Sequence, residues 1–199
     1  MPQRQASQEN VFSLDEEFVD PGYMIVDGAR IKDWKAGGHG VETFREVLQN
    51  SCNPGFMTIG LRLGKERLFK YISSFGFGEK TGIDLLGESK GIIFDVNKIG
   101  NVELATSSFG QGNSVTAIQL INAASAAVNG GKLNQPAILY GIGNPMTNDV
   151  IYQDFPFFKK QVISEETSKK LGLNSIEAAT ATPEGAAKWV IEAKNKIVD

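Results

Sequence analysis

The sequence predicts an α+β fold in which helices outnumber strands. Residues 11–34 alternate short apolar runs with turn-forming residues, which is typical of brief strands joined by tight turns. Helical periodicity dominates residues 43–75 and 116–128. Strand-forming residues return between 135 and 158, interrupted by a turn, and predict one further hairpin. With 199 residues and 41% of them hydrophobic, the chain is long enough to bury one core, so a single domain is expected.

The segment around residue 51 is predicted to be a break between two helices. Thr43 and Glu46 have the spacing of a capping box, so a first helix should run from about Thr43 to Asn50. Pro54 has no backbone N–H, so the chain should break at Ser51-Cys52-Asn53 and restart as a second helix that reaches Leu63. Such a break is a good place to expose side chains.

Three further helices are expected. Residues 65–75 have apolar residues on one face and are followed by Gly76, a suitable C-terminal cap. Residues 116–128 are rich in alanine and apolar on most faces, which favours a buried central helix. Residues 177–199 are expected to form the last helix.

Charge and composition exclude several classes of function. The chain has 20 basic and 23 acidic residues and a net charge of −3, so nucleic acid is not an expected partner. No stretch approaches the roughly 20 apolar residues of a membrane span, and the first ten residues do not resemble a signal peptide. The only cysteine, Cys52, excludes an intrachain disulfide, and the only histidine is His39.

Two strings of residues resemble the transpeptidase domain of class B penicillin-binding proteins, especially the elongation and sporulation types. The first is Gly37-Gly38-His39-Gly40 followed by Leu48-Gln49-Asn50-Ser51-Cys52-Asn53-Pro54. The second is Phe75-Gly76-Phe77-Gly78-Glu79-Lys80-Thr81-Gly82-Ile83-Asp84-Leu85, followed by Ser108-Phe109-Gly110-Gln111-Gly112 and the helix after it. Their order and separation are specific together, and the resemblance covers about residues 11–170.

The resemblance implies a partial penicillin-binding-protein transpeptidase (serine β-lactamase-like) domain, mostly its helical part with a few strands. Residues 171–199 read as a divergent tail. The family transfers an acyl group from a D-Ala-D-Ala stem peptide to the amine of another stem, which cross-links peptidoglycan. In its Ser-x-Asn motif the hydroxyl helps proton transfer and the amide holds the acyl donor, and Ser51 and Asn53 stand at those positions. Taken alone, Ser-Cys-Asn before a proline is more often a simple helix end.

Two other catalytic motifs of the family have no counterpart here. No Ser-x-x-Lys pair precedes Val11, so the nucleophilic serine and its lysine are missing. Lys80-Thr81-Gly82 spells the third motif, but its neighbours match a structural loop of the family, and no Lys-Thr-Gly strand follows residue 170. The chain by itself is therefore expected to be inactive towards stem peptides and β-lactams.

Asp33, His39 and Cys52 are separated by six and thirteen residues and offer the donor types of tetrahedral zinc. The elongation-type enzymes carry a zinc site that this spacing resembles, and the resemblance makes Asp20 the fourth ligand. Asp15 and Asp27 are nearby alternatives. Four protein ligands would make the zinc structural. The alternative interpretation is a buried apolar Cys52 and a histidine with an ordinary role in a turn.

Gly110-Gln111-Gly112 resembles the family loop that shapes the cleft floor and is expected to contribute to substrate binding together with Ser51 and Asn53. A plain turn before a helix is an equally good interpretation.

The resemblance also predicts partners and location. The intact parent protein is expected to bind peptidoglycan stem peptides, β-lactams and other cell-wall synthesis proteins. It is expected to be anchored in the bacterial cytoplasmic membrane with this domain on the outer face. Two other functional classes stay open: an inactive binding module and a truncated product without function.

Overall fold

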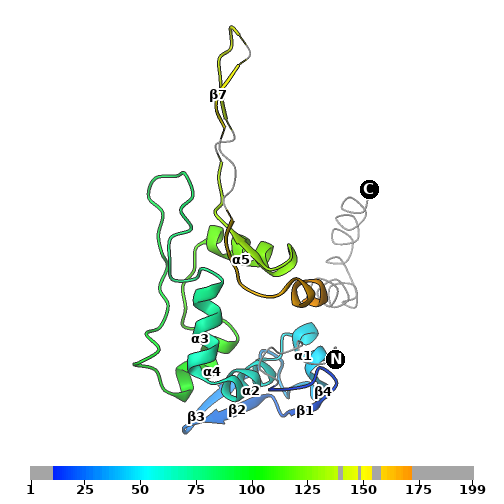
Figure 1. Ribbon diagram of the computed structural model, residues 1–199. Coiled ribbons are helices and arrows are strands. Elements are labelled where there is room, and N and C mark those ends of the chain that lie inside the picture. Colours follow the sequence, from blue (N-terminus) through cyan, green and yellow to red (C-terminus); the bar gives the residue numbers. More distant parts are fainter. Residues whose placement is uncertain (1–10, 139–140, 148, 154–157, 172–199) are drawn as a thin grey trace. The chain divides into compact units, whose positions relative to one another are not determined.

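The structure is a computed structural model that describes residues 11–138, 141–147, 149–153 and 158–171. Its elements are shown in Figure 1 and run in the order β1 (Glu17–Asp20), β2 (Tyr23–Val26), β3 (Ala29–Lys32), β4 (Gly40–Thr43), α1 (Phe44–Asn50), α2 (Asn53–Leu63), α3 (Lys65–Ser74), α4 (Asn101–Ser108), α5 (Ala117–Val128), β5 (Lys132–Asn134), β6 (Gly141–Gly143), β7 (Val150–Gln153) and β8 (Phe158–Gln161). The mixture of helices and short strands confirms the predicted α+β class.

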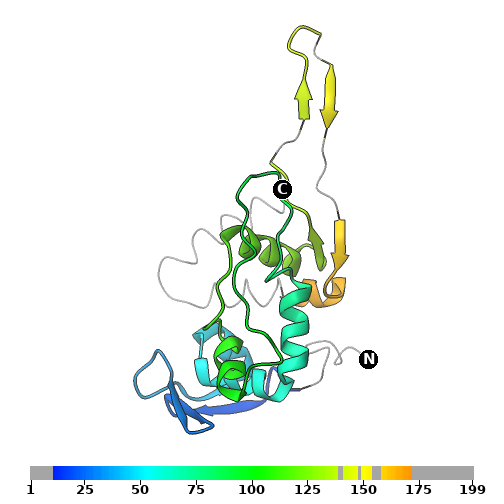
Figure 2. The same ribbon diagram turned by 90° about the vertical axis from the view of Figure 1, so that its left-hand side faces the viewer.

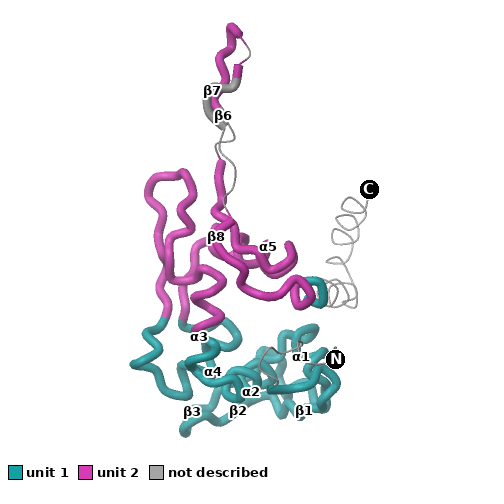
Figure 3. Tube along the Cα trace, in the orientation of Figure 1, with its two compact units in different colours: residues 1–69, 94–112, 169–199 teal, residues 70–93, 113–168 magenta. Residues whose placement is uncertain are grey.

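The chain divides into two compact units (Figure 3). Of the described residues, the first unit comprises 11–69, 94–112 and 169–171, and the second comprises those within 70–93 and 113–168.

The strands of the first unit form two antiparallel pairs. The turn signals between residues 11 and 34 predicted short strands in that range, but not how they pair. β2 and β3 form a hairpin through Asp27 and Gly28, which both have positive φ angles. β1 pairs with β4, so that Val19 lies opposite Val41. β4 was not predicted, since it has only four residues and leads directly into α1.

The helix break around residue 51 lies where the sequence predicted it. Thr43 caps α1: its side chain accepts a hydrogen bond from the amide of Glu46, whose carboxylate accepts one from the amide of Thr43 at 2.7 Å. α1 ends at Ser51, and α2 begins with Cys52 as its N-cap and Pro54 in its first turn. The same local signals that are visible in the sequence therefore fix both helix ends.

α4 was not predicted from the sequence. It packs along α2 in the first unit, and the two helices approach closely where Gly60 faces Ser108. A Cβ atom at Gly60 would lie only 2.4 Å from the Cβ of Ser108. Because α4 is short and carries polar Thr and Ser side chains, its stability comes from this packing rather than from helix propensity.

Two apolar clusters form the core of the first unit. One is centred on Val26, Met57 and Ala105, which join β2, α2 and α4. The other consists of Phe44, Val47 and Cys52 and lies under the helix break. The buried side of the helix break therefore packs against side chains that are almost completely inaccessible to solvent.

The second unit is built around α5, which begins with a capping box between Thr116 and Gln119. α5 packs against β5, which pairs with β8, while β6 and β7 form the predicted hairpin seen in Figure 2. The prediction of a buried central helix was wrong for α5. Only one of its faces is buried, and Leu120, Ile121 and Val128 are more than half exposed. An apolar composition could not show which face has a partner.

The predicted helix at residues 177–199 lies outside the described residues. Among the helices that the structure describes, none has the length and apolar character needed to cross a bilayer.

Candidate functional site

Ser51 lies at the exposed corner between α1 and α2. Its backbone is left-handed, with a φ angle of 53° and a ψ angle of 42°, which is uncommon for a residue other than glycine. Its N–H still donates to the carbonyl of Leu48, and the N–H of Cys52 donates to the carbonyl of Val47. The corner thus closes α1 and presents the Ser51 side chain at the surface.

Asn53 begins α2 and is held by the loop that follows β3. Its backbone N–H donates to Oδ1 of Asp33 at 2.9 Å, and its side-chain amide donates to the carbonyl of Lys32 at 3.3 Å. Ser51 and Asn53, the two residues predicted to act on the substrate, therefore lie in the same turn, and this turn is hydrogen-bonded to Asp33.

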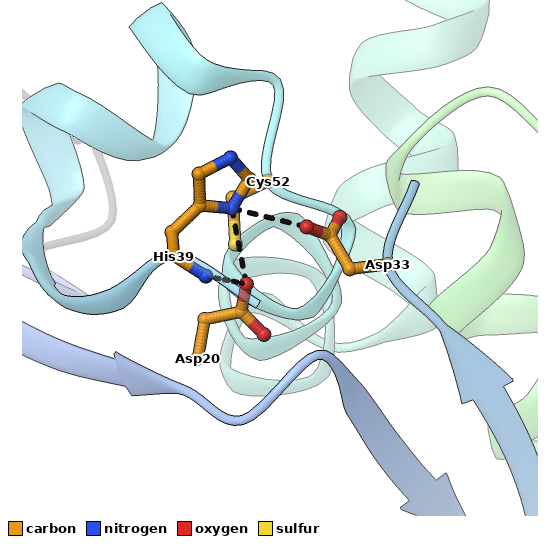
Figure 4. Close-up of side chains that lie close together, drawn as sticks. All are labelled: Asp20, Asp33, His39 and Cys52. Atoms are coloured by element: carbon orange, nitrogen blue, oxygen red, sulfur yellow. Dashed lines mark hydrogen bonds and ion pairs between the residues drawn. The ribbon is translucent and has the colours of Figure 1, made fainter. Parts of the chain in front are cut away.

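The structure brings together the four residues predicted to bind zinc. Asp20, Asp33, His39 and Cys52 each direct one donor atom towards the others, and these atoms all lie within 4.8 Å of one another (Figure 4). Asp20 comes from the end of β1, Asp33 follows β3, His39 precedes β4, and Cys52 caps α2. Four separate segments thus converge on one buried point.

Hydrogen bonds and close contacts orient the two carboxylates around the imidazole. Nδ1 of His39 lies 3.0 Å from Oδ2 of Asp20 and 3.0 Å from Oδ2 of Asp33. Burial alone would raise the pKa of Asp20, but hydrogen bonds from the amides of Gly22 and His39 and from the imidazole outweigh it and lower the pKa. Asp20 is therefore held as a carboxylate although its side chain is inaccessible to solvent.

Cys52 is fully buried, and its sulfur accepts a hydrogen bond from the amide of Gly55 at 3.3 Å. Burial raises the pKa of the thiol, and the neighbouring carboxylates of Glu42 and Asp20 raise it further. An N-cap sulfur points at the free amides of a helix, an environment that favours a thiolate once a cation is present.

The two alternative ligands lie elsewhere. Asp15 is an exposed partner of Arg45, at 3.4 Å, and Asp27 is in the exposed turn between β2 and β3. Of the three aspartates considered for the fourth position, only Asp20 faces His39.

The arrangement fits a divalent cation. Tetrahedral zinc separates its donor atoms by about 3.5 Å, so adjustments of about 1 Å would bring these atoms into coordination. Oδ2 of Asp33 is buried and lies 3.0 Å from Nδ1 of His39, but it accepts no hydrogen bond among the described residues, which is costly for a carboxylate oxygen. Two carboxylates, one imidazole and one thiol also form a donor set that zinc accepts.

Glycines allow the loops that carry Asp20 and His39 to touch. Gly38 has a φ angle of 76°, and a Cβ atom there would lie 2.3 Å from the nitrogen of Gly22 and 2.4 Å from the carbonyl oxygen of Asp20. No side chain fits in this gap, so glycine at position 38 is a condition for the site.

Gly110, Gln111 and Gly112 end α4 within the first unit. The amides of Gly110 and Gln111 donate to the carbonyls of Ser107 and Thr106, and all three residues are exposed. Among the described residues, no hydrogen bond links them to Ser51 or Asn53. The structure thus gives this loop a helix-ending role, and its contact with substrate stays a prediction.

Lys80-Thr81-Gly82 forms a loop in the second unit. The hydroxyl and amide of Thr81 donate to Oε1 of Glu88 at 2.6 and 2.5 Å, and the amide of Gly82 donates to Oε2. The ammonium of Lys159 donates to the carbonyl of Thr81. Thr81 is buried and its hydroxyl is occupied, as suits a structural loop.

One buried residue next to the site was missed in the sequence. Glu42 of β4 is only 4% exposed, and its carboxylate accepts a hydrogen bond from the side chain of Asn50 at 2.8 Å. The alternation of Val41, Glu42 and Thr43 after a glycine was the available signal, because it places a carboxylate on the inner face of a short strand.

Comparison with known proteins identifies the family of the chain. The sequence profile of the family described as penicillin binding protein transpeptidase domain matches residues 5–195. Stage V sporulation protein D of Bacillus subtilis is 54% identical over 175 residues, which cover 88% of this chain and 27% of that protein. Peptidoglycan D,D-transpeptidase MrdA of Haemophilus influenzae is 29% identical over 192 residues, covering 89% of this chain and 29% of that protein. The chain therefore spans less than a third of these two relatives.

Solved structures share the fold. The D,D-transpeptidase domain of a peptidoglycan glycosyltransferase from Eggerthella lenta matches with a TM-score of 0.80 at 20% identity, covering 92% of this chain and 49% of that one. Penicillin binding protein 3 of Mycobacterium tuberculosis, complexed with aztreonam, matches with a TM-score of 0.78 at 27% identity, covering 92% of this chain and 41% of that one. The profile match over nearly the whole sequence and this shared fold show that the chain belongs to the penicillin-binding protein transpeptidase domain family.

Proposed function

We propose that this chain is the part of a peptidoglycan D,D-transpeptidase that carries the Ser-x-Asn motif on a metal-supported cleft wall. The observation that carries the proposal is the placement of Ser51 and Asn53 at the helix break. The backbone amide of Asn53 donates a hydrogen bond to Asp33, which is a member of the buried four-residue cluster. A binding motif on a rigid support is what precise positioning of a substrate requires.

The reaction needs two kinds of polar group from this wall. In acyl transfer from a D-Ala-D-Ala stem, the nucleophile loses a proton as it attacks the carbonyl, and the leaving amine gains one. The Ser51 hydroxyl can donate and accept at once, so it can pass a proton between neighbouring groups. The Asn53 amide offers donors and an acceptor at fixed angles and can orient the donor peptide. The chain itself contains no Ser-x-x-Lys pair to supply the nucleophile.

A structural zinc ion completes the proposal. Asp20, Asp33, His39 and Cys52 would hold it, and a site closed by four protein ligands stabilises a fold rather than activating water. The ion would neutralise the buried carboxylates and hold the loops of β1, β3 and β4 against the start of α2. Loss of the metal would then loosen the segment that bears Ser51 and Asn53.

The relatives suggest the biological setting of the parent protein. The identity of 54% to Stage V sporulation protein D, against 29% to Peptidoglycan D,D-transpeptidase MrdA, favours a sporulation role for the parent. We extend to the parent the binding of stem peptides and of β-lactams such as aztreonam, which is bound in the structure of the related M. tuberculosis protein. We also extend to it contacts with other cell-wall synthesis proteins and a membrane anchor that leaves this domain outside the cell.

A segment exchange tests the function. Residues 11–170 would replace the matching segment of the B. subtilis sporulation protein, and labelling by a fluorescent penicillin would be followed on denaturing gels. Labelling is expected, and Ser51→Ala should slow it about 10²-fold or more, as for loss of a group in proton transfer. Ser73→Ala, at an exposed serine of α3, is the matched control and should leave the rate unchanged.

Two results would count against the proposal. An exchanged protein that folds but is not labelled would contradict a transpeptidase role and favour a binding module or a product without function. Covalent labelling of the isolated chain would contradict the expectation that it lacks the nucleophile.

A further inference from the structure

Asn50, which precedes Ser51, is hydrogen-bonded on both sides. Its side-chain amide donates to Oε2 of Glu42 at 2.8 Å, and its carbonyl accepts from the indole Nε1 of Trp34 at 3.0 Å. These partners come from β4 and from the loop after β3, so two segments distant in sequence meet at one residue of the helix end.

The backbone of Ser51 explains why such support is needed. Helices that end in a left-handed residue usually place glycine or asparagine there, because a side chain makes this conformation unfavourable. Glycine would remove the hydroxyl that the proposed reaction uses. A serine at this position therefore requires contacts that exclude the alternative backbone conformations.

The two hydrogen bonds of Asn50 restrain the backbone of Ser51 to different degrees. Glu42 is buried, so its hydrogen bond to the Asn50 amide is shielded from water and is the stronger restraint. Trp34 is 65% exposed, and its bond to the Asn50 carbonyl competes with water. Its ring also contacts His39 edge-on, with 5.5 Å between ring centroids, so it is itself oriented.

We propose that Asn50 is a positioning residue, held by Glu42 and Trp34, that keeps Ser51 in its left-handed conformation and so aims the Ser51 hydroxyl. The proposal rests on the proposed function for the use of that hydroxyl, but its structural part stands on the chain alone. Trp34 follows Asp33 and contacts His39, and Glu42 lies beside Cys52, so Asn50 adds a second connection between the four-residue cluster and this turn, besides the hydrogen bond from Asn53 to Asp33.

Nuclear magnetic resonance on the full chain tests this directly. The ¹³Cα and ¹³Cβ shifts of Ser51 report its backbone conformation, and the exchange rate of the Cys52 amide reports the opening of the corner. In Asn50→Ala, the Ser51 shifts should move away from left-handed values, and the Cys52 amide should exchange about tenfold faster, as expected for loss of a buried hydrogen bond.

Matched variants separate positioning from general stability. Asn122→Ala removes a comparable bond, from Asn122 to the carbonyl of Asn134 at 2.9 Å, in the second unit and should leave both Ser51 readouts unchanged. Glu42→Gln keeps an acceptor oxygen and should preserve them, whereas Glu42→Ala should reproduce the effect of Asn50→Ala. Trp34→Phe removes only the indole donor and should give a smaller change.

The proposal is overturned if Asn50→Ala leaves the Ser51 shifts and Cys52 exchange as in the wild type. It is equally overturned if Glu42→Gln behaves like Glu42→Ala. If Asn50→Ala does not fold, the two Glu42 variants decide the matter. None of these readouts uses penicillin or a metal, so failure of the proposed function leaves them interpretable.

Discussion

Asp33 accepts a hydrogen bond from the backbone amide of Asn53, with 2.9 Å between Oδ1 and the nitrogen. The other oxygen of the same carboxylate lies 3.0 Å from Nδ1 of His39. One buried side chain therefore joins the candidate metal site to the start of α2. Whatever moves Asp33 must also move the turn that carries Ser51 and Asn53.

Removal of this carboxylate should destabilise the first unit. Asp33→Ala is expected to lower the free energy of unfolding by about 2 kcal/mol, the contribution of a buried hydrogen bond to a charged group. Asp33→Asn keeps an oxygen that can accept from Asn53 and should cost less. Urea unfolding measures both, and Asp15→Ala, at an exposed aspartate with a surface contact to Arg45, is the control. Equal effects of Asp33→Ala and Asp15→Ala would show that the bond contributes nothing.

Two adjacent glycines should respond differently to alanine. Gly38→Ala forces a Cβ atom into the backbone of Gly22 and Asp20, so we expect a loss of more than about 3 kcal/mol and displacement of Asp20. Gly37 has a φ angle of 85°, and no atom lies within 4 Å of the position that a Cβ would take, so Gly37→Ala should cost only the conformational strain of about 1 kcal/mol. Thermal unfolding distinguishes the two, and similar losses would refute the close approach at Gly38.

The left-handed backbone of Ser51 should lower the stability of the chain relative to a glycine at this position. Ser51→Gly removes the strain of a left-handed backbone and should be about 1 kcal/mol more stable than Ser51→Ala, which keeps it. Both variants lack the hydroxyl and should slow penicillin labelling of the exchanged protein equally. Denaturant unfolding gives the first comparison. An alanine variant as stable as the glycine variant would mean that the backbone of Ser51 is not left-handed in solution.

Local signals account for what the sequence could predict of the site. Thr43 with Glu46 and the missing N–H of Pro54 act within a few residues, so the break at Ser51 could be placed from the sequence. The donor types and spacing of Asp33, His39 and Cys52 indicated a cluster, which the structure brings together.

Features that depend on distant partners could not be predicted. α4 is held by α2, some forty residues earlier in the chain, and has little amphipathic pattern of its own. The role of Glu42 depends on β4, a short strand whose partner β1 lies about 20 residues away. Leu120 of α5 looks like a core residue by composition, yet the described chain leaves it exposed.

Glu88 should make the second unit sensitive to acid. Partial burial tends to raise its pKa, but hydrogen bonds from Thr81 and Gly82 and the charge of Lys80 outweigh this and hold the pKa below its ordinary value of 4.5. A lowered pKa in the folded state means stability that is present above the unfolded-state pKa and is lost as the pH falls through the folded-state pKa.

The variant Glu88→Gln tests whether the charge of Glu88 stabilises the folded chain at neutral pH. It should be about 1 kcal/mol less stable than the wild type at pH 7, and the difference should disappear as the pH falls through the lowered pKa of Glu88. Glu17→Gln, at an exposed residue of β1, is the control for the loss of one surface charge. A difference that is constant from pH 7 to pH 3 would exclude a charged Glu88 as the acceptor.

The central claim is that Asp20, Asp33, His39 and Cys52 bind a structural metal ion, and that this ion holds in place the helix break that carries Ser51 and Asn53. Its most direct test is metal analysis with zinc-edge X-ray absorption on the chain purified without a histidine tag. We expect one zinc per chain, with one sulfur at about 2.3 Å and three nitrogen or oxygen donors at about 2.0–2.2 Å. Asp27→Asn should retain this signal and Cys52→Ser should lose it. Absence of zinc from the wild type, or the same zinc content in Cys52→Ser, would contradict the claim.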